Sequence, residues 1–144
     1  MYTVKFIRLS EKATAPCKAH SDDAGFDVYA SEELLLKAHE FGCVPTGISM
    51  ELPAGTEAQI RPRSGLAAKN GITVLNAPGT VDAGYRGELK VILINHSDRD
   101  FLVTPGMRIA QMVIAPIYEA EFVEVQTLSD TARGEGGFGS SGLK

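Results

Sequence analysis

Short apolar runs are the feature that most constrains this chain. They alternate with polar residues, and Pro or Gly interrupts them at Pro53-Ala-Gly55, Asn70-Gly71, Pro78-Gly79 and Pro105-Gly106. Alternation is typical of half-buried strands, and Gly and Pro mark turns, so we expect an all-β fold of many short strands, a jelly-roll-like barrel or sandwich. Only Ser64–Lys69 has a helical pattern, with Ser64 as the candidate N-cap.

The apolar runs give a set of expected strands. They cover Tyr2–Phe6, Phe26–Ala30, Leu34–Lys37, Gly42–Leu52, Glu57–Pro62, Ile72–Leu75, Glu88–Asn95, Phe101–Val103, Met107–Ile117 and Glu121–Gln126. Residues between Asn76 and Glu88 are interpreted as the turn of a hairpin whose arms are Ile72–Asn76 and Glu88–Asn95. Apolar residues occupy both the odd and the even positions of Met107–Ile117. We therefore expect this strand to bury both of its faces, one in the core and one in an oligomer interface.

Length and charge exclude several classes of protein. The 144 residues fit one domain, and 44% hydrophobic residues suffice for a core. Because the net charge is −4, we do not expect stable nucleic-acid binding through phosphate neutralisation. No apolar run approaches the roughly 20 residues of a membrane span, and no secretory signal is expected. Two cysteines, Cys17 and Cys43, favour a reducing compartment, so we expect a cytoplasmic protein, with nucleus and organelle as open alternatives.

The C-terminus changes in composition, so we divide the chain into a β domain, 1–132, and a Gly/Ser-rich segment, 133–144. Its glycines match G-x-G-x-x-G, but only five residues follow Gly139, too few for a dinucleotide-binding unit. Composition alone favours a mobile, solubilising tail. However, Arg133 offers a bidentate phosphate donor and Phe138 a face for a base, which favours a flexible lid that closes over a nucleotide.

Other polar segments have two interpretations each. Arg61–Ala68 is either an ordinary capped helix or a cationic anion site. Asp82 and Tyr85 lie within Asn76–Glu88. They are either ordinary turn residues, or Asp82 is a carboxylate that deprotonates water beside the aromatic ring of Tyr85. Arg108 and Gln111 interrupt an apolar strand, where they either hydrogen-bond within the core or contact a ligand.

Metal sites held directly by the protein are not expected. The carboxylates of Asp22–Asp27 lack EF-hand spacing and fit a solvated turn. Cys17-x-x-His20 has no second ligand pair, which argues against zinc. The chain also lacks the nucleophile elbow G-x-S-x-G and a phosphate-binding Walker A sequence.

In this order, five segments resemble the signature motifs of the trimeric all-β dUTP pyrophosphatases (dUTPases). They are Ala24–Ala30, Pro62–Ala67, Asn76–Gly87, Gly106–Gln111 and Arg133–Gly142. The resemblance implies hydrolysis of dUTP to dUMP and pyrophosphate, which limits uracil incorporation into DNA and supplies dUMP for thymidylate synthesis. It also implies a homotrimer with three active sites, each built from all three subunits.

The resemblance further implies residue roles. Asp82 activates the water, with Gln111 and Arg63 as further catalytic residues. Ser64 and Gln111 bind the phosphates near the scissile bond, and Arg63 and Arg108 lie in the surrounding polar network. Gly65, Asn76, Gly79 and Tyr85 also bind the substrate, with Tyr85 against the deoxyribose. Arg133, Phe138, Gly139 and Ser140 close over the nucleotide. Mg²⁺ is held mainly by substrate phosphates and waters, with Asp27 reaching it through water.

Two alternatives stay open at this point. One is a dCTP deaminase on the same fold, against which the segment from Asn76 to Tyr85 and the Phe138 tail argue. The other is a non-catalytic jelly-roll module that binds dUTP, against which Asp82 argues.

Overall fold

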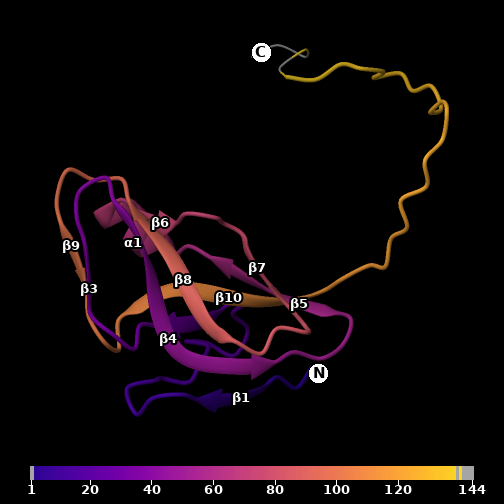
Figure 1. The fold of residues 1–144 in the computed structure, drawn as a ribbon. Helices are drawn as coiled ribbons and strands as arrows, with labels where there is room; N and C mark the ends of the chain where they lie inside the picture. The colour runs from indigo at the N-terminus through magenta and orange to yellow at the C-terminus, as the bar shows by residue number, and fades with distance from the viewer. Residues whose placement is uncertain (1, 139, 141–144) are drawn as a thin grey trace.

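A computed structural model describes residues 2–138 and 140 (Figure 1). Within that range it contains one helix, α1 (Ser64–Asn70), and ten strands. The strands are β1 (Lys5–Arg8), β2 (Phe26–Tyr29), β3 (Leu34–Leu36), β4 (Phe41–Glu51), β5 (Thr56–Arg61), β6 (Ile72–Val74), β7 (Gly79–Asp82), β8 (Glu88–Asn95), β9 (Phe101–Val103) and β10 (Arg108–Pro116).

The strands form two four-stranded antiparallel sheets and one short pair. The strand orders are β1-β4-β8-β6 and β2-β10-β5-β7, and β3 pairs with β9. Val91 and Leu93 of β8 and Ile60 and Met112 of the second sheet are buried in one core. Because alternate residues of each strand point inward, the apolar residues of the sequence pattern fill this core. The expected mostly β fold is confirmed.

The segment between Asn76 and Glu88 differs from the expected hairpin. Ile72 and Val74 of β6 do pair with β8, as expected. The residues that follow are not a simple turn, because Gly79–Asp82 form β7 and pair with β5 of the other sheet. This segment therefore connects the two sheets and presents Asp82 at an exposed strand end.

Two further expectations are corrected. Glu121–Gln126 forms no strand, because no neighbouring strand of the same chain lies beside it to accept its backbone hydrogen bonds. Arg63, not Ser64, is the N-cap of α1, and it makes no side-chain capping hydrogen bond. In one chain β10 buries Ile109, Ala110 and Met112, and burial of its other face in an oligomer interface stays a prediction.

The outer face of β10 is half-buried, and the chain continues from it as a long extended segment. This segment leaves the body and runs away from both sheets (Figure 1). It exposes large apolar side chains, among them Tyr118, Phe122 and Leu128.

No helix in the described part of the chain is long and apolar enough to cross a membrane.

Candidate active site

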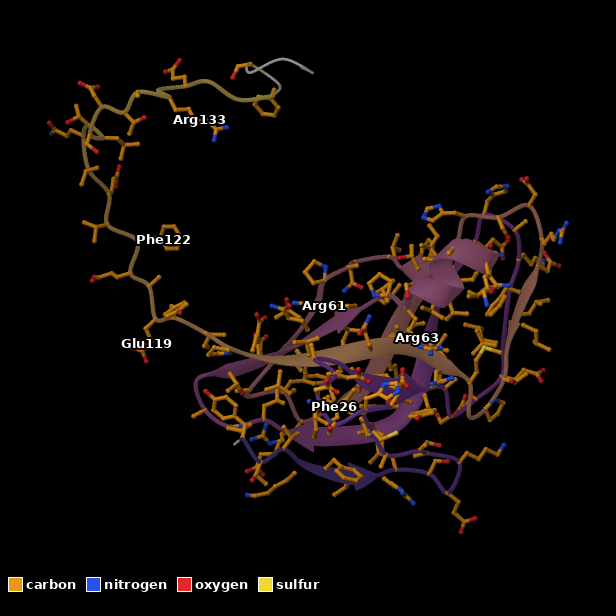
Figure 2. All side chains as sticks on the ribbon, turned by 180° about the vertical axis from the view of Figure 1, so that it is seen from behind. Phe26, Arg61, Arg63, Glu119, Phe122 and Arg133 are labelled. Atoms are coloured by element: carbon orange, nitrogen blue, oxygen red, sulfur yellow. The ribbon has the colours of Figure 1, made fainter. Side chains whose placement is uncertain are left out.

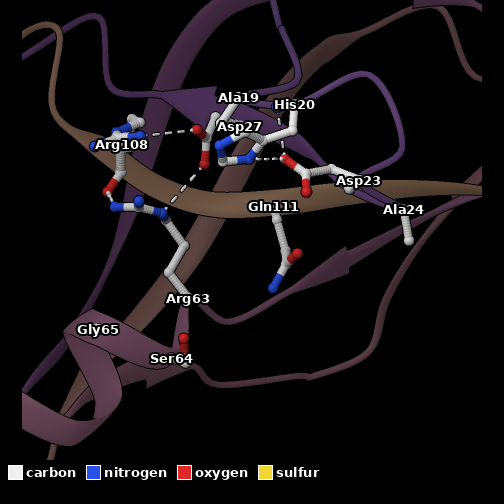
Figure 3. A pocket seen from close by; sticks show the side chains of 11 residues that line it. Ala19, His20, Asp23, Ala24, Asp27, Arg63, Ser64, Gly65, Arg108 and Gln111 are labelled. Atoms are coloured by element: carbon white, nitrogen blue, oxygen red, sulfur yellow. Dashed lines mark hydrogen bonds and ion pairs between the residues drawn. The ribbon is translucent and has the colours of Figure 1, made fainter.

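The first candidate site is a pocket of about 330 Å³ where β2, β10 and the β5–α1 junction meet (Figure 3). We call it the arginine pocket. Its polar lining comprises His20, Asp23, Asp27, Arg63, Ser64, Arg108 and Gln111. Three segments that are far apart in the sequence therefore contribute to one cavity.

An ion-pair network joins these segments. Asp27 Oδ1 lies 3.2 Å from Arg63 Nε, and Asp27 Oδ2 lies 3.1 Å from Arg108 Nη1. Arg63 Nη1 also donates to the carbonyl oxygen of Arg108, at 3.3 Å. The strand register explains the proximity, because Asp27 of β2 is opposite Gln111 of β10.

Gln111 is fixed by its neighbours on both sides. Its Nε2 donates to the carbonyl oxygen of Pro62 at 2.9 Å. A Cβ at residue 25 would come within 2.5 Å of Gln111 Oε1, so a larger residue there would force the Gln111 side chain to move. Ser64 and Gly65 are exposed in the first turn of α1, where the hydroxyl of Ser64 is accessible to a ligand.

Loop 17–25 forms a wall of the arginine pocket that the sequence analysis missed. The backbone N–H of His20 donates to Asp23 Oδ2 at 2.8 Å, and His20 Nδ1 lies 3.3 Å from the same oxygen. The backbone hydrogen bond is the main cause that lowers the pKa of Asp23 below its ordinary value. His20 was considered only as a partner of Cys17, but Cys17 Sγ instead lies 3.0 Å from Tyr29 Oη. Loop 17–25 lies just before Asp27 in the sequence, and this closeness is the signal that would have linked the loop to the site.

A second pocket, of about 290 Å³, contains Asp82 and Tyr85 at the end of β7. We call it the hairpin pocket, and Thr80, Glu88, Lys90, Ile92 and Cys43 also line it. Tyr85 N–H donates to the carbonyl oxygen of Asp82 at 3.0 Å, and Tyr85 Oη donates to that of Glu88 at 2.9 Å. These bonds fix the turn, and they leave the Tyr85 side chain 47% exposed. Asn76 packs beside Gly79 at the start of β7, outside the set of side chains that line this pocket.

The remaining expected site residues lie on the extended tail. Arg133 is far from the body of the chain, at the distal end of the segment that carries Phe122 (Figure 2). Its Nε donates to the carbonyl oxygen of Gly136 at 2.8 Å, and Phe138 is fully exposed. Ser140 belongs to the same end of the tail, and Gly139 lies outside the described residues. Within one chain, then, none of the described tail residues lines either pocket.

Comparison with known proteins establishes the relationship of this chain to others. A family model described as dUTPase matches residues 11–142. The chain belongs to the dUTPase family. The deoxyuridine 5'-triphosphate nucleotidohydrolase of Crocosphaera subtropica is 59% identical over 140 residues, covering 97% of this chain and 99% of the relative. That of Gloeothece citriformis is 61% identical, with 97% of each chain covered.

Solved dUTPase structures match this chain along almost its whole length. The dUTPase of Staphylococcus bacteriophage 80alpha, solved with dUpNHpp, is 30% identical with a TM-score of 0.90, covering 98% of this chain and 99% of that one. A D95N mutant of the phage phi11 dUTPase is 26% identical with a TM-score of 0.80, and covers 87% of this chain and 97% of its own. That mutant structure contains a coordinated structural Mg(II) ion.

Among the described residues, no group of three or more His, Cys, Asp or Glu side chains is placed to hold a metal ion. Asp27 and Asp23 are the carboxylates of the arginine pocket, and both oxygens of Asp27 contact arginines. A divalent ion in this pocket would therefore need ligands from the substrate or from water.

Proposed function

We propose that this dUTPase hydrolyses dUTP to dUMP and pyrophosphate in active sites that copies of the chain share within a homotrimer. The activity itself is that of the family to which the chain belongs. Removal of dUTP limits uracil incorporation into DNA, and the product dUMP supplies thymidylate synthesis. The observation that supports shared sites is that the arginine pocket and Asp82 lie in separate cavities of one chain.

The arginine pocket is suited to the phosphate chain. A triphosphate is strongly anionic and the protein carries a net charge of −4, so overall charge opposes binding. Local cations must reverse this, and Arg63 and Arg108 are both partly exposed in the pocket. Ser64 and Gln111 add polar groups that bind phosphate oxygens near the scissile bond.

Asp82 is the candidate general base. It is exposed at the end of β7, and among the described residues it has no ion-pair partner that would compete for its oxygens. A carboxylate that takes the proton from an attacking water contributes about 10²–10⁴-fold to the rate. The leaving group is pyrophosphate, whose charge the arginines stabilise.

The hairpin pocket is suited to the nucleoside. Tyr85 would lie against the deoxyribose and exclude a 2′-hydroxyl. Backbone groups near Asn76 and Gly79 would read the uracil edge, since a fixed donor and acceptor pattern rejects cytosine by leaving buried polar groups unpaired, at about 1–3 kcal/mol each. The hydrogen bonds of Tyr85 to Asp82 and Glu88 support this role, because they hold the pocket in shape before ligand arrives.

The tail would then complete the site of another copy. Residues 133–144 form a separate unit in this proposal, a lid in which Arg133, Gly139 and Ser140 hold the distal phosphates and Phe138 stacks on uracil. Its support is the extended course of the tail, which carries Arg133 away from the pockets of its own chain. Lid closure would exclude water other than the nucleophile.

Magnesium would enter with the substrate. The dUTPase family uses Mg²⁺-dUTP, and the ion supplies charge neutralisation of the phosphates. In this chain the phosphates and water would hold it, with Asp27 in contact through water. We also assign the reaction to the cytoplasm, on the support of the free cysteines Cys17 and Cys43.

The test is product analysis with several nucleotides. Purified protein is incubated with dUTP, dCTP, dTTP and UTP, with Mg²⁺ or with EDTA, and pyrophosphate and ammonia are measured. We expect Mg²⁺-dependent pyrophosphate from dUTP only. Ammonia from dCTP would support a deaminase instead, and binding of dUTP without product would support a non-catalytic nucleotide sensor.

A further inference from the structure

We infer that Asp27 is a positioning residue, which holds the guanidinium groups of Arg63 and Arg108 at the places where they meet the phosphate chain. This inference rests on the proposed function, because it assigns the arginine pocket to phosphates. It adds a role that does not depend on a metal ion.

The geometry of the carboxylate carries the inference. The Asp27 side chain is 14% exposed, whereas those of Arg63 and Arg108 are 27% and 47% exposed. Each oxygen of Asp27 contacts a different arginine, at 3.2 and 3.1 Å. One carboxylate thus connects the β5–α1 junction to the start of β10 (Figure 3).

Asp27 itself is held from both sides. Its backbone N–H donates to the carbonyl oxygen of Cys17 at 2.7 Å, and its partner across the β2–β10 pair is Gln111. Since neighbours on either side fix its backbone, the carboxylate is a firm attachment point for the two longer, more exposed side chains.

The arginines need such an attachment point. Two guanidinium groups placed side by side repel one another, and the carboxylate between them leaves a net charge of one. Each guanidinium has five N–H donors in a rigid fork. Arg108 donates one of them to Asp27 at 3.1 Å, whereas Arg63 contacts Asp27 as an ion pair and donates one N–H to the carbonyl oxygen of Arg108. The remaining donors keep a fixed direction, which is what bidentate phosphate binding requires.

The inference makes a prediction that separates it from a metal contact. A residue that acts only through Mg²⁺ affects binding only when Mg²⁺ is present. A residue that orients arginines affects binding of the phosphate chain without any metal. Deoxyuridine has no phosphate, so its affinity should not respond to Asp27.

The experiment measures metal-free affinity. Binding of dUpNHpp in EDTA and of deoxyuridine is measured for the wild-type chain, Asp27→Asn and Asp98→Asn, the last at a carboxylate that is 96% exposed and lies outside the arginine pocket. We expect Asp27→Asn to weaken dUpNHpp at least about tenfold in EDTA, as loss of the charged contacts to both arginines predicts, with deoxyuridine unchanged. Asp98→Asn should stay near wild type.

A second experiment uses Asp27→Ala, a variant that lacks the carboxylate. Asp27→Ala should lose dUpNHpp affinity and regain part of it in added formate, which supplies a carboxylate. Unchanged metal-free affinity in Asp27→Asn, or a loss that extends equally to deoxyuridine, would overturn the inference. If the wild-type chain binds dUpNHpp but releases no pyrophosphate from dUTP, the proposed function fails while this binding test still decides the role of Asp27.

Discussion

Asp82 and Gln111 face the same side of one sheet, yet they belong to separate pockets with β5 between them. Asp82 is opposite Glu57 of β5, whereas Gln111 is opposite Arg61. Strand geometry puts the two residues about 16 Å apart. A general base acts within hydrogen-bond reach or through one water, so one copy cannot apply both residues to the same phosphorus. The proposed trimer resolves this separation by combining pockets from different copies.

Replacement of the candidate base should separate binding from turnover. We expect Asp82→Asn to lower kcat by about 10²–10⁴-fold, because the amide cannot accept the proton of water. Affinity for dUpNHpp, measured by calorimetry, should change little, since size and shape are kept. Asp98→Asn, at a carboxylate 96% exposed on a distant turn, is the matched control. Near-normal turnover in Asp82→Asn would remove the general base from the proposal.

The Tyr85 ring should control sugar selection. We expect Tyr85→Ala to reduce the preference for dUTP over UTP, as the ratio of kcat/KM values, at least about tenfold. Tyr85→Phe keeps the ring and loses only the hydrogen bond to Glu88. It should therefore retain the preference. An unchanged ratio in Tyr85→Ala would show that the ring only packs.

The tail should matter for activity and not for folding. A chain that ends after Ala132 loses a segment whose described residues line neither pocket, so its melting temperature should equal that of the full chain, while dUTP hydrolysis collapses. Phe138→Ala should weaken dUpNHpp binding by about 1–3 kcal/mol, the range of base–aromatic stacking. Normal hydrolysis by the truncated chain would contradict the lid.

The stability of the loop that forms one wall of the arginine pocket should depend on pH through the carboxyl group of Asp23. The pKa of this carboxyl is lowered chiefly by the His20 backbone N–H, so the charged form stabilises the fold. That stability is present above the ordinary pKa, near 4, and is lost as the pH falls through the lower folded value.

Carbon-detected NMR titration of the Asp23 carboxyl measures the shift. His20→Ala keeps the backbone donor and should keep most of it, whereas His20→Pro removes the donor and should return the pKa of Asp23 toward its ordinary value. A pKa of Asp23 that already returns to its ordinary value in His20→Ala would show that the imidazole is the main cause.

Much of the fold could be predicted from the sequence, because alternation of apolar residues depends only on which face of a strand is buried. β8 and β10 follow this rule closely. β7 was missed because it begins at Gly79 directly after Pro78, and turn residues conceal a short strand whose existence depends on pairing with a distant β5. The strand expected over Glu121–Gln126 was wrong in this chain because pairing needs a neighbour, which alternation does not supply.

The candidate site, like the fold, could be predicted from the sequence only in part. Arg108 and Gln111 were found as polar residues in an apolar strand, and Arg63 as part of a cationic segment. The site role of Asp27 came only from the family resemblance, because its own segment fits a solvated turn. The structure brings all four into one pocket. The ion pairs between them depend on strand register, which the sequence does not encode in any local pattern. His20 was missed because its role as a pocket wall arises from the fold of loop 17–25 and not from its residue type.

Mixing two inactive variants tests the shared site most directly. Asp82→Asn and Gln111→Ala are co-expressed with different affinity tags, and mixed oligomers that carry both tags are isolated and assayed for dUTP hydrolysis. If each site takes these residues from different copies, every mixed trimer contains one site of its three in which both residues are intact, so about one third of wild-type turnover is restored. Mixed oligomers no more active than either variant alone would contradict the account.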